Sequence, residues 1–362
     1  MNRIHLDPAV LVSIVVRNYN YAHFLRDALD SAVAQTHPRV EIIVIDDGSS
    51  DGSSVVLKEY ETRCRILFQP NQGEIGALNS GFSAVRGDLV LFLDADDVLA
   101  PGAVAAVVAA WTPDVARISF PMRVMTETGR LLDVQRPHGE ALDLTIEQQF
   151  AQFGEAVSAC QSANAYAASV LRPILPIDEQ AWSFPPDCYL NALTSVSGRM
   201  VSLPDPLGGY RLHSSNFTLR NTVDRRRRAG VAAMHVRLHE ALRRFVGEAL
   251  WPRFRPILPT FHWFHRLISL CAMPDLHPFP CDRRGALLRR CLGAVWAKQD
   301  AGLGRKLILI SGAFTVALLP SWLLRRLLPG LLMVARGARY PGLYLFRWSR
   351  LRHWRRVYRL SC

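Results

Sequence analysis

Two aspartates stand directly after an uncharged apolar stretch. Asp94 and Asp96 follow residues 89–93, LVLFL, which are typical of a buried strand because every side chain is apolar. Carboxylates two positions apart in a loop can bend toward one ion, and hard divalent cations prefer such oxygen ligands. The alternative is a solvated turn in which Asp97 caps a helix whose first turn holds Pro101. The spacing thus indicates a divalent-metal site, with the solvated turn left open.

A second acidic cluster, DDGSSD over residues 46–51, follows the apolar residues 41–45. A carboxylate here can accept a hydrogen bond from a ring N–H of a base, and Gly48 permits close backbone approach. Taken alone, the cluster is equally compatible with a polar turn. Residues 71–81, NQGEIGALNSG, place small residues on a helix face that can lie flat against a sheet or a ligand.

Alternating strands and helices must position these clusters. Apolar β-branched runs separated by helical spacing predict a parallel sheet with both faces covered. Ligands bind at the carboxyl ends of the strands in such sheets, where the polar clusters stand. The expected strands are 11–16, 41–45, 65–68 and 89–93, and the expected helices are 24–34, 53–60 and 75–85.

The pattern changes after Pro101. Residues 118–125 and 131–134 flank a turn and predict a hairpin. Later segments are a helix opened by Pro185-Pro186, strands over 200–203 and 207–212, and a helical, basic region from about Val223 with an amphipathic helix over 231–249.

In this order and at these spacings, four stretches resemble family 2 of the glycosyltransferases, which have the GT-A fold. They are VSIVVRNYN (12–20), EIIVIDDGSSD (41–51), NQGEIGALNSG (71–81) and GDLVLFLDADD (87–97). The similarity continues more loosely to about residue 220. It implies an α/β, GT-A (Rossmann-like) fold with a mixed, mainly parallel sheet and flanking helices. It also implies inverting transfer of a sugar from a nucleotide-sugar donor, with UDP expected, to a hydroxyl acceptor in cell-surface glycan or polysaccharide synthesis.

The resemblance implies a donor site in the first hundred residues. Tyr19 falls where the family places an aromatic ring against the base, with Asn20 beside it. Asp47 falls where a carboxylate holds uracil. Asp94 and Asp96 match the DxD motif, which holds the donor ribose and the Mg²⁺ or Mn²⁺ that bridges the diphosphate.

An inverting transfer needs a general base that takes a proton from the attacking hydroxyl. The family's base is a carboxylate at the start of a helix, and Asp187 falls in that place. The glutamate that usually precedes it is replaced by Pro186. A first-turn acid favoured by the helix dipole is the structural alternative for Asp187. Asp178 and Glu179 are the next candidates.

Basic residues also fall within the resemblance. The family usually has Pro-Thr where this chain has Arg17-Asn18, so we expect Arg17 to contact a phosphate. The stretch Tyr210–His213, YRLH, is similar to a YRxH motif in part of the family. It implies that Arg211 offsets leaving-group charge and that His213 reaches the metal or the diphosphate. A metal and a cation beside the departing diphosphate supply on the order of several kcal/mol of transition-state stabilisation.

Charge divides the chain unevenly. Residues 1–216 carry 15 Lys+Arg against 25 Asp+Glu and residues 217–362 carry 28 against 6, net charges of about −10 and +22. We expect a glycosyltransferase domain over 1–220, with a donor half over 1–100 and an acceptor half over 101–220. Residues 221–362 are expected to form a basic helical region. Such a region indicates an anionic partner, which is nucleic acid, a phosphorylated carrier or, as we expect, an anionic membrane surface.

The apolar residues 307–324 carry no charge over 18 positions, which is long enough for a transmembrane candidate. Pro320 and basic residues on both flanks argue against a single span and favour a helix in the membrane interface. Residues 336–359 add eight Arg interleaved with aromatic residues. A buried helical subdomain is the alternative.

Location follows from the termini and the cysteines. The first residues contain no apolar signal region, and the seven scattered cysteines form no CxxC pair. We expect a cytoplasmic protein, peripheral on the cytoplasmic face of the inner or plasma membrane, with a glycan or lipid-linked acceptor.

Three other functions compete with sugar transfer. A nucleic-acid-binding protein would explain the basic half but not the four donor motifs in an acidic half. A catalytically inactive GT-A protein that binds a nucleotide sugar or a partner remains the alternative. A Rossmann dehydrogenase is disfavoured because no GxGxxG follows the first strand.

Overall fold

The computed structural model describes residues 9–136, 159–213, 225–254, 260–296 and 302–327. The chain forms two compact units. The first comprises residues 1–148, 156–212 and 241–247, and the second comprises the remaining residues.

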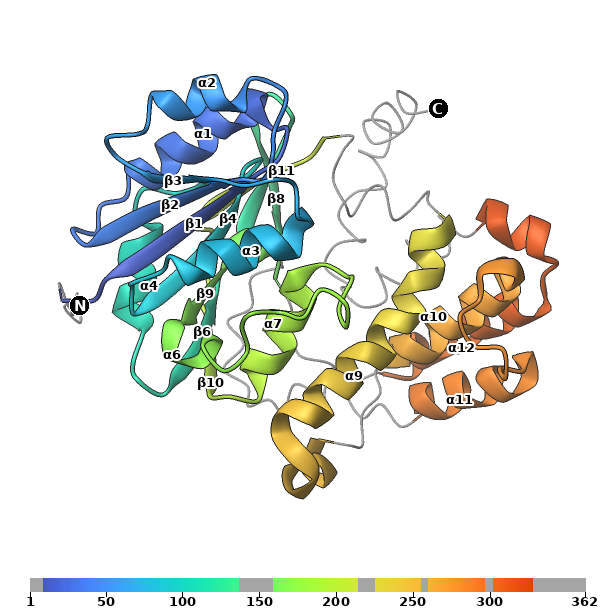
Figure 1. Ribbon diagram of the computed structural model, residues 1–362. Coiled ribbons are helices and arrows are strands. Elements are labelled where there is room, and N and C mark those ends of the chain that lie inside the picture. Colours follow the sequence, from blue (N-terminus) through green and yellow to red (C-terminus); the bar gives the residue numbers. More distant parts are fainter. Residues whose placement is uncertain (1–8, 137–158, 214–224, 255–259, 297–301, 328–362) are drawn as a thin grey trace. The chain divides into compact units, whose positions relative to one another are not determined.

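A seven-stranded sheet is the centre of the first unit (Figure 1). Its strands are β1 (Val12–Asn18), β2 (Val40–Asp46), β3 (Arg65–Phe68), β4 (Leu89–Asp94), β6 (Val115–Ser119), β9 (Asn164–Ala167) and β10 (Arg199–Ser202). The spatial order is β10-β6-β9-β4-β1-β2-β3. Only β9 runs antiparallel to its neighbours β4 and β6 among these strands. The predicted α/β fold with a mixed, mainly parallel sheet is confirmed.

Helices cover both faces of this sheet, with α1 and α2 on one face and α3 on the other (Figure 1). The helices are α1 (Ala22–Val33), α2 (Ser53–Lys58), α3 (Gly73–Ser83), α4 (Ala103–Ala110), α6 (Ala168–Leu171) and α7 (Pro186–Ser195). Side chains alternate along β1, so Val12, Ile14 and Val16 share a buried cluster with Leu25 and Leu29 of α1. This two-sided burial explains why the strands are apolar throughout.

The small residues of α3 let this helix lie directly on the sheet. A Cβ atom at Gly81 would stand 2.4 Å from Cγ1 of Val15 and 3.3 Å from Cγ1 of Ile45. Real Cβ atoms do not approach that closely, so the position requires glycine. The flat helix face predicted over 71–81 is therefore confirmed.

A second, four-stranded sheet has the order β5-β11-β7-β8. Its strands are β5 (Val98–Leu99), β7 (Met122–Met125), β8 (Leu131–Arg136) and β11 (Gly208–Arg211). The hairpin of β7 and β8 is confirmed, but extending it back to Ile118 was wrong. Residues 115–119 form β6 of the large sheet, and Pro121, which has no N–H for a ladder, separates the two strands. Pro101 also lies before α4, whose N-cap is Gly102, and not within its first turn.

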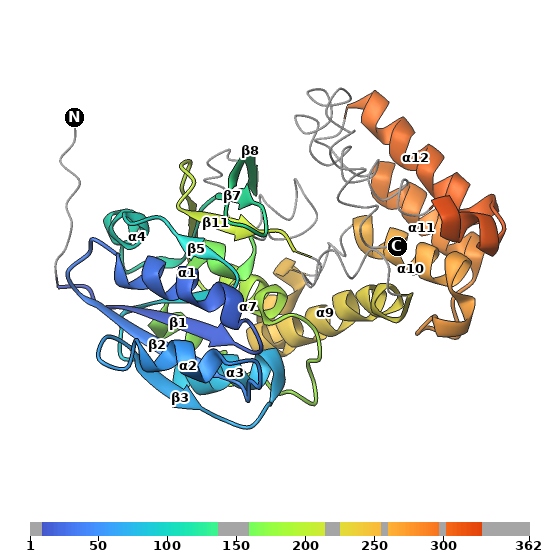
Figure 2. The same ribbon diagram turned by 90° about the horizontal axis from the view of Figure 1, so that it is seen from above.

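The second unit is helical in its described part. It contains the 3-10 turn η2 (Pro274–Leu276) and the helices α10 (Thr260–Ala272), α11 (Arg284–Trp296) and α12 (Leu303–Leu318). α9 (Arg225–Phe254), interrupted at Gly247, belongs partly to each unit. Figure 2 shows α10, α11 and α12 beside one another. Their shared core includes Leu267, Cys291 and Ala313.

The apolar run 307–324 divides between this core and solvent. Leu309, Val316 and Leu324 are buried, whereas Leu307 and Leu318 are exposed. The helix α12 ends at Leu318, just before Pro320. Within the described ranges, no helix is both long and apolar enough to cross a membrane. The arginine-rich residues 336–359 lie outside the described residues.

Candidate functional site

Polar residues gather where β1, β2 and β4 end. The parallel register pairs Asn18 with Asp46, and Arg17 with Asp94. Asn18 donates its amide N–H to Asp46 at 2.8 Å, which ties the ends of β1 and β2 together. This register brings the polar residues that follow β1, β2 and β4 to one edge of the sheet, as the sequence predicts.

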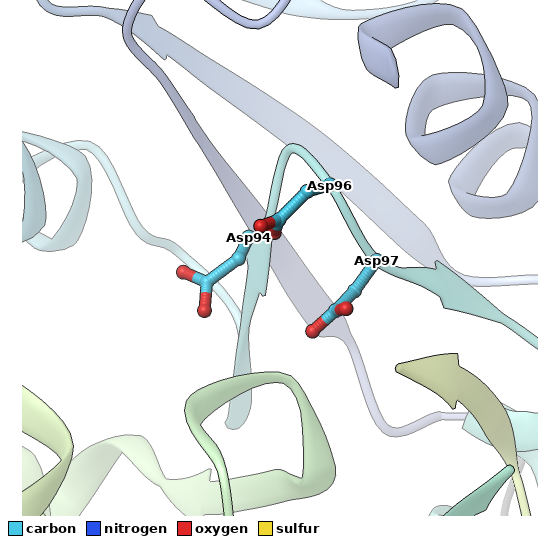
Figure 3. Close-up of side chains that lie close together, drawn as sticks. All are labelled: Asp94, Asp96 and Asp97. Carbon is cyan, nitrogen blue, oxygen red and sulfur yellow. The ribbon is translucent and has the colours of Figure 1, made fainter. Parts of the chain in front are cut away.

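Three carboxylates lie together on the turn between β4 and β5 (Figure 3). One oxygen of each of Asp94, Asp96 and Asp97 lies within 4.8 Å of the others. The turn is closed by a 3.0 Å hydrogen bond from the Asp97 N–H to the Asp94 carbonyl. Asp97 is buried, and its Oδ2 has no hydrogen-bond partner.

The electrostatics of this cluster favour a bound cation. Burial raises the pKa of Asp94 to about 6, and the charge of Asp96 adds to the shift while Arg17 opposes it. Burial also raises the pKa of Asp97, as do the charges of Asp96 and Asp94. Three crowded carboxylates with one orphaned buried oxygen fit a hard divalent cation such as Mg²⁺ or Mn²⁺. The sequence pattern predicts Asp97 only as a helix cap and so does not identify this third carboxylate.

Arg17 pairs with Asp94 inside this site. Its guanidinium contacts the Asp94 carboxylate, and its Nη1 donates to the Glu74 carbonyl oxygen at 3.2 Å. The Arg17 side chain is only 9% exposed. The sequence did not suggest this pair, because the two residues are distant in the chain and meet through the β1–β4 register.

Asp47 directly follows β2, and its buried carboxylate lies at the N-terminus of α3. Its carboxylate accepts hydrogen bonds from the Gln69 side chain at 2.7 Å and from the N–H groups of Gln72 and Gly73, both at 2.8 Å. A carboxylate has about four acceptor positions, so one remains for a ring N–H of a base. Asp47 therefore anchors the helix and retains capacity for the predicted base contact.

Tyr19 and Asn20 form the turn after β1. The Tyr19 side chain is exposed, as a ring that stacks on a base requires. Asn20 has a φ of 57°, in the left-handed region, and its side-chain oxygen accepts the Ser50 N–H at 2.8 Å. Its own N–H donates to Ser49 at 2.9 Å. Asn20 thus joins the turns that follow β1 and β2.

Asp187 lies in the first turn of α7, directly after Pro185 and Pro186. Its carboxylate accepts the Cys188 N–H at 2.8 Å. Burial raises the pKa of Asp187, Glu74 adds to this shift, and the charge of Arg17 lowers the pKa. The negative charges of both Asp94 and Asp187 act in turn on Arg17 and favour its charged form.

The Arg211 guanidinium is almost fully enclosed by the protein's own groups. It donates to the Asp96 carbonyl at 2.8 Å, to the Glu127 carbonyl at 2.9 Å and to the Asp27 carboxylate at 2.8 Å. The backbone N–H of Arg211 also donates to Asp97 at 3.0 Å. These bonds hold the turn that carries the three carboxylates.

His213 is buried two residues beyond the end of β11. The carboxylate cluster found among the described residues does not include it. Its contact with a metal or a diphosphate stays a prediction, as does the contact of Arg211 with a leaving group.

The sequence is similar to those of known proteins. Residues 13–175 match the family described as Glycosyl transferase family 2. An uncharacterized glycosyltransferase of Nostoc sp. (strain PCC 7120) is 34% identical over 211 residues, which are 57% of this chain and 66% of that protein. Another, from Rickettsia prowazekii, is 41% identical over 91 residues, which are 25% of this chain and 29% of that protein. The chain thus spans less than two thirds of either relative.

Two solved structures share the fold. S. aureus TarS 1–349 in complex with UDP-GlcNAc aligns with a TM-score of 0.51 at 14% identity, covering 93% of each chain. The mannosyltransferase PcManGT from Pyrobaculum calidifontis, in complex with GDP-Man and Mn²⁺, aligns with a TM-score of 0.50 at 18% identity. That alignment covers 94% of this chain and 90% of PcManGT. The fold is that of the GT-A glycosyltransferases. Through residues 13–175, the protein belongs to glycosyl transferase family 2.

Proposed function

We propose that the protein is a metal-dependent, inverting glycosyltransferase that uses a nucleotide-sugar donor. The observation that carries this proposal is the cluster of Asp94, Asp96 and Asp97 at the carboxyl edge of the sheet. A hard cation held there neutralises the charge of a diphosphate leaving group. Tyr19 and the remaining acceptor position of Asp47 stand at the same edge and suit a base.

The donor is proposed to be UDP-linked. The site combines an exposed aromatic ring with a buried carboxylate that accepts from a ring N–H, and uracil offers such a donor at N3. The TarS complex contains UDP-GlcNAc, whereas the PcManGT complex contains GDP-Man. Both share only the fold with this chain, so they support the nucleotide-sugar class and not the base or the sugar.

Asp187 is proposed as the general base. Its carboxylate takes the proton of the acceptor hydroxyl while that oxygen forms a bond to the anomeric carbon. The bond from that carbon to the phosphate oxygen breaks, and its electron pair leaves with the diphosphate. Attack on the face opposite the leaving group inverts the anomeric configuration. The raised pKa of Asp187 makes it a stronger base than an exposed aspartate.

The departing diphosphate is negatively charged. Arg211 and His213 are proposed to offset this charge together with the metal. Arg211 acts chiefly by holding the carboxylate turn in place, given its bonds to Asp96 and Asp27. His213 is proposed as a further metal or diphosphate contact. Preorganised charge of this kind stabilises the transition state without reorganisation during the reaction.

A thermal-shift panel tests the donor assignment. UDP-, GDP- and dTDP-sugars are added with and without Mn²⁺, since a ligand at 100 times its Kd adds about 2.7 kcal/mol of stability. A UDP-sugar should raise the melting temperature most, and Mn²⁺ should increase the shift. Release of UDP when a membrane fraction supplies the acceptor then tests transfer. Failure of every nucleotide sugar to stabilise the protein would overturn the proposal.

The second unit is proposed to hold the protein on the cytoplasmic face of the inner or plasma membrane. Leu303, Leu307, Phe314 and Leu318 are exposed on α12 at spacings of four and seven residues, which places them on one helix face. We call them the α12 stripe. The exposed Arg325 and Arg326 follow it, and basic side chains near apolar ones favour anionic lipid. Such a location suits a lipid-linked or cell-surface glycan acceptor.

A further inference from the structure

A guanidinium already occupies part of the carboxylate cluster. Arg17 reaches Asp94 from the neighbouring strand β1, and its Nη1 donates to the Glu74 carbonyl. Its Nε is buried and has no hydrogen-bond partner. Asp94 therefore pairs with an internal cation and also belongs to the cluster with Asp96 and Asp97, which Figure 3 shows and which could hold a metal ion.

Two cations on one carboxylate oppose each other. Like charges repel each other, and the repulsion is stronger near a protein than in bulk water because the effective dielectric constant is lower. The Arg17–Asp94 contact must weaken, or the metal must bind less tightly than three carboxylates alone allow. Glu74 and Asp187 also act on Arg17, so the guanidinium has other negative charge nearby when Asp94 engages a metal.

We propose that Arg17 is a built-in counter-cation of Asp94 that competes with the divalent metal. The free protein then binds metal weakly, while the site stays preorganised because Asp94 is never left without a positive partner. Arg17 is a positioning residue in this scheme. The inference rests on the metal site of the proposed function and adds to it the residue that sets metal affinity.

The test is a titration of the full chain with Mn²⁺ in the absence of nucleotide. The electron paramagnetic resonance signal of free Mn²⁺ measures how much of the metal is bound. Arg17→Gln should bind Mn²⁺ roughly tenfold more tightly than the wild type, because one positive charge beside the ligand is removed. Arg17→Lys, which retains the charge, should stay near the wild-type affinity. Arg17→Met replaces Arg17→Gln if circular dichroism shows that the glutamine variant is unfolded.

Arg86→Gln is the matched control. Arg86 pairs with Glu41 just before β4, at the opposite end of that strand from Asp94, and its side chain is 71% exposed. The Arg86→Gln variant loses one positive charge from the same unit as Arg17→Gln does. Because that charge lies far from Asp94, the Mn²⁺ affinity of the variant should equal that of the wild type. An equal gain in Arg86→Gln would mean that net charge alone is responsible, and the proposal would be wrong.

Other outcomes separate this inference from the proposed function. Unchanged or weaker Mn²⁺ binding by the charge-removed variants, with intact binding of UDP, overturns the role of Arg17 alone. Weakened UDP binding without any change in Mn²⁺ affinity would make Arg17 a phosphate contact and also overturn it. Absence of both UDP and Mn²⁺ binding in the wild type overturns the proposed function as well.

Discussion

At the residue scale, three carboxylates and one guanidinium make up the proposed metal site. Asp94 and Asp96 were recognisable because carboxylates two positions apart follow a wholly apolar strand. Asp97 was not, since an acid before a helix is as readily a cap. The Arg17–Asp94 pair depends on β1 and β4 being neighbours, and no local pattern states which strands are neighbours.

Asp96 is the residue whose loss should separate metal binding from folding. Its carboxylate is part of the three-carboxylate cluster on a partly exposed turn, so Asp96→Asn should leave the fold intact. We expect Mn²⁺ binding to fall at least tenfold and transfer to be lost, because a neutral amide replaces an anionic ligand. Calorimetric titration with Mn²⁺ measures this, with Asp133→Asn as a control outside the cluster. Transfer at the wild-type rate would rule out the metal assignment.

Asp187→Asn should separate catalysis from donor binding. Removing a general base lowers rates by about 10²- to 10⁴-fold, so kcat should fall by that factor while UDP affinity changes only a few-fold. A pH profile of wild-type kcat should show activity lost, as pH falls, through a pKa above that of an ordinary aspartate. Equal losses in kcat and in UDP affinity would instead assign Asp187 to the donor site.

The same substitution should stabilise the protein. Because burial raises the folded-state pKa of Asp187 above its unfolded value, the ionised carboxylate destabilises the fold at neutral pH. That penalty disappears as pH falls through the folded-state pKa. Asp187→Asn should therefore melt at a higher temperature than the wild type at pH 7, and the difference should shrink in acid. A lower melting temperature at pH 7 would mean that the charge makes a net favourable contact.

At the element scale, periodicity predicted most of the first unit and failed where tertiary pairing decides. The strands β1, β2, β3 and β4 and the helices α1, α2 and α3 follow directly from apolar runs and helical spacing. The assignment of residues 118–125 to one hairpin failed because β6 and β7 are similar apolar strands in different sheets. Partner choice depends on three-dimensional packing that a window of residues does not contain.

Gly81→Ala tests the contact between α3 and the sheet. Alanine normally favours a helix over glycine, but here the added methyl would stand 2.4 Å from Val15. Overpacking of a core typically costs about 1–3 kcal/mol, so the variant should be less stable and should bind UDP more weakly. Gly293→Ala on α11, where nothing lies within 4 Å, is the matched control and should not be destabilised. Chemical denaturation measures both, and an unchanged Gly81→Ala variant would contradict the tight packing.

At the scale of the whole molecule, charge divides the sequence into an acidic part, residues 1–216, and a basic part, residues 217–362. The fold confirms the mixed sheet of the first unit, and α10, α11 and α12 give the second unit a core of its own. For the apolar run 307–324, the sequence alone does not show what covers its apolar side chains. A stretch without charge predicts removal from water, and five of its 18 residues are already buried in the core that α12 shares with α10 and α11.

Membrane binding through the α12 stripe is best tested by point substitutions. Deleting residues 303–362 would also remove the buried Leu309 and Val316 and so unfold the second unit. Replacing the exposed Leu307 and Leu318 by Gln removes apolar contact and leaves the core intact. At about 25 cal/mol per Å² of apolar surface, loss of two leucines should weaken vesicle binding by roughly tenfold or more.

The measurement is flotation of the full chain with vesicles of anionic and of neutral lipid. Wild-type protein should float with anionic vesicles and be released by salt, since each basic residue near the surface contributes about 1 kcal/mol. The variant with Val55→Gln and Leu131→Gln, two exposed apolar residues of the first unit, is the control and should float like the wild type. Equal flotation of the α12 variant would place the contact elsewhere. Flotation resistant to both salt and carbonate would contradict peripheral binding, because only insertion across the apolar core survives that treatment.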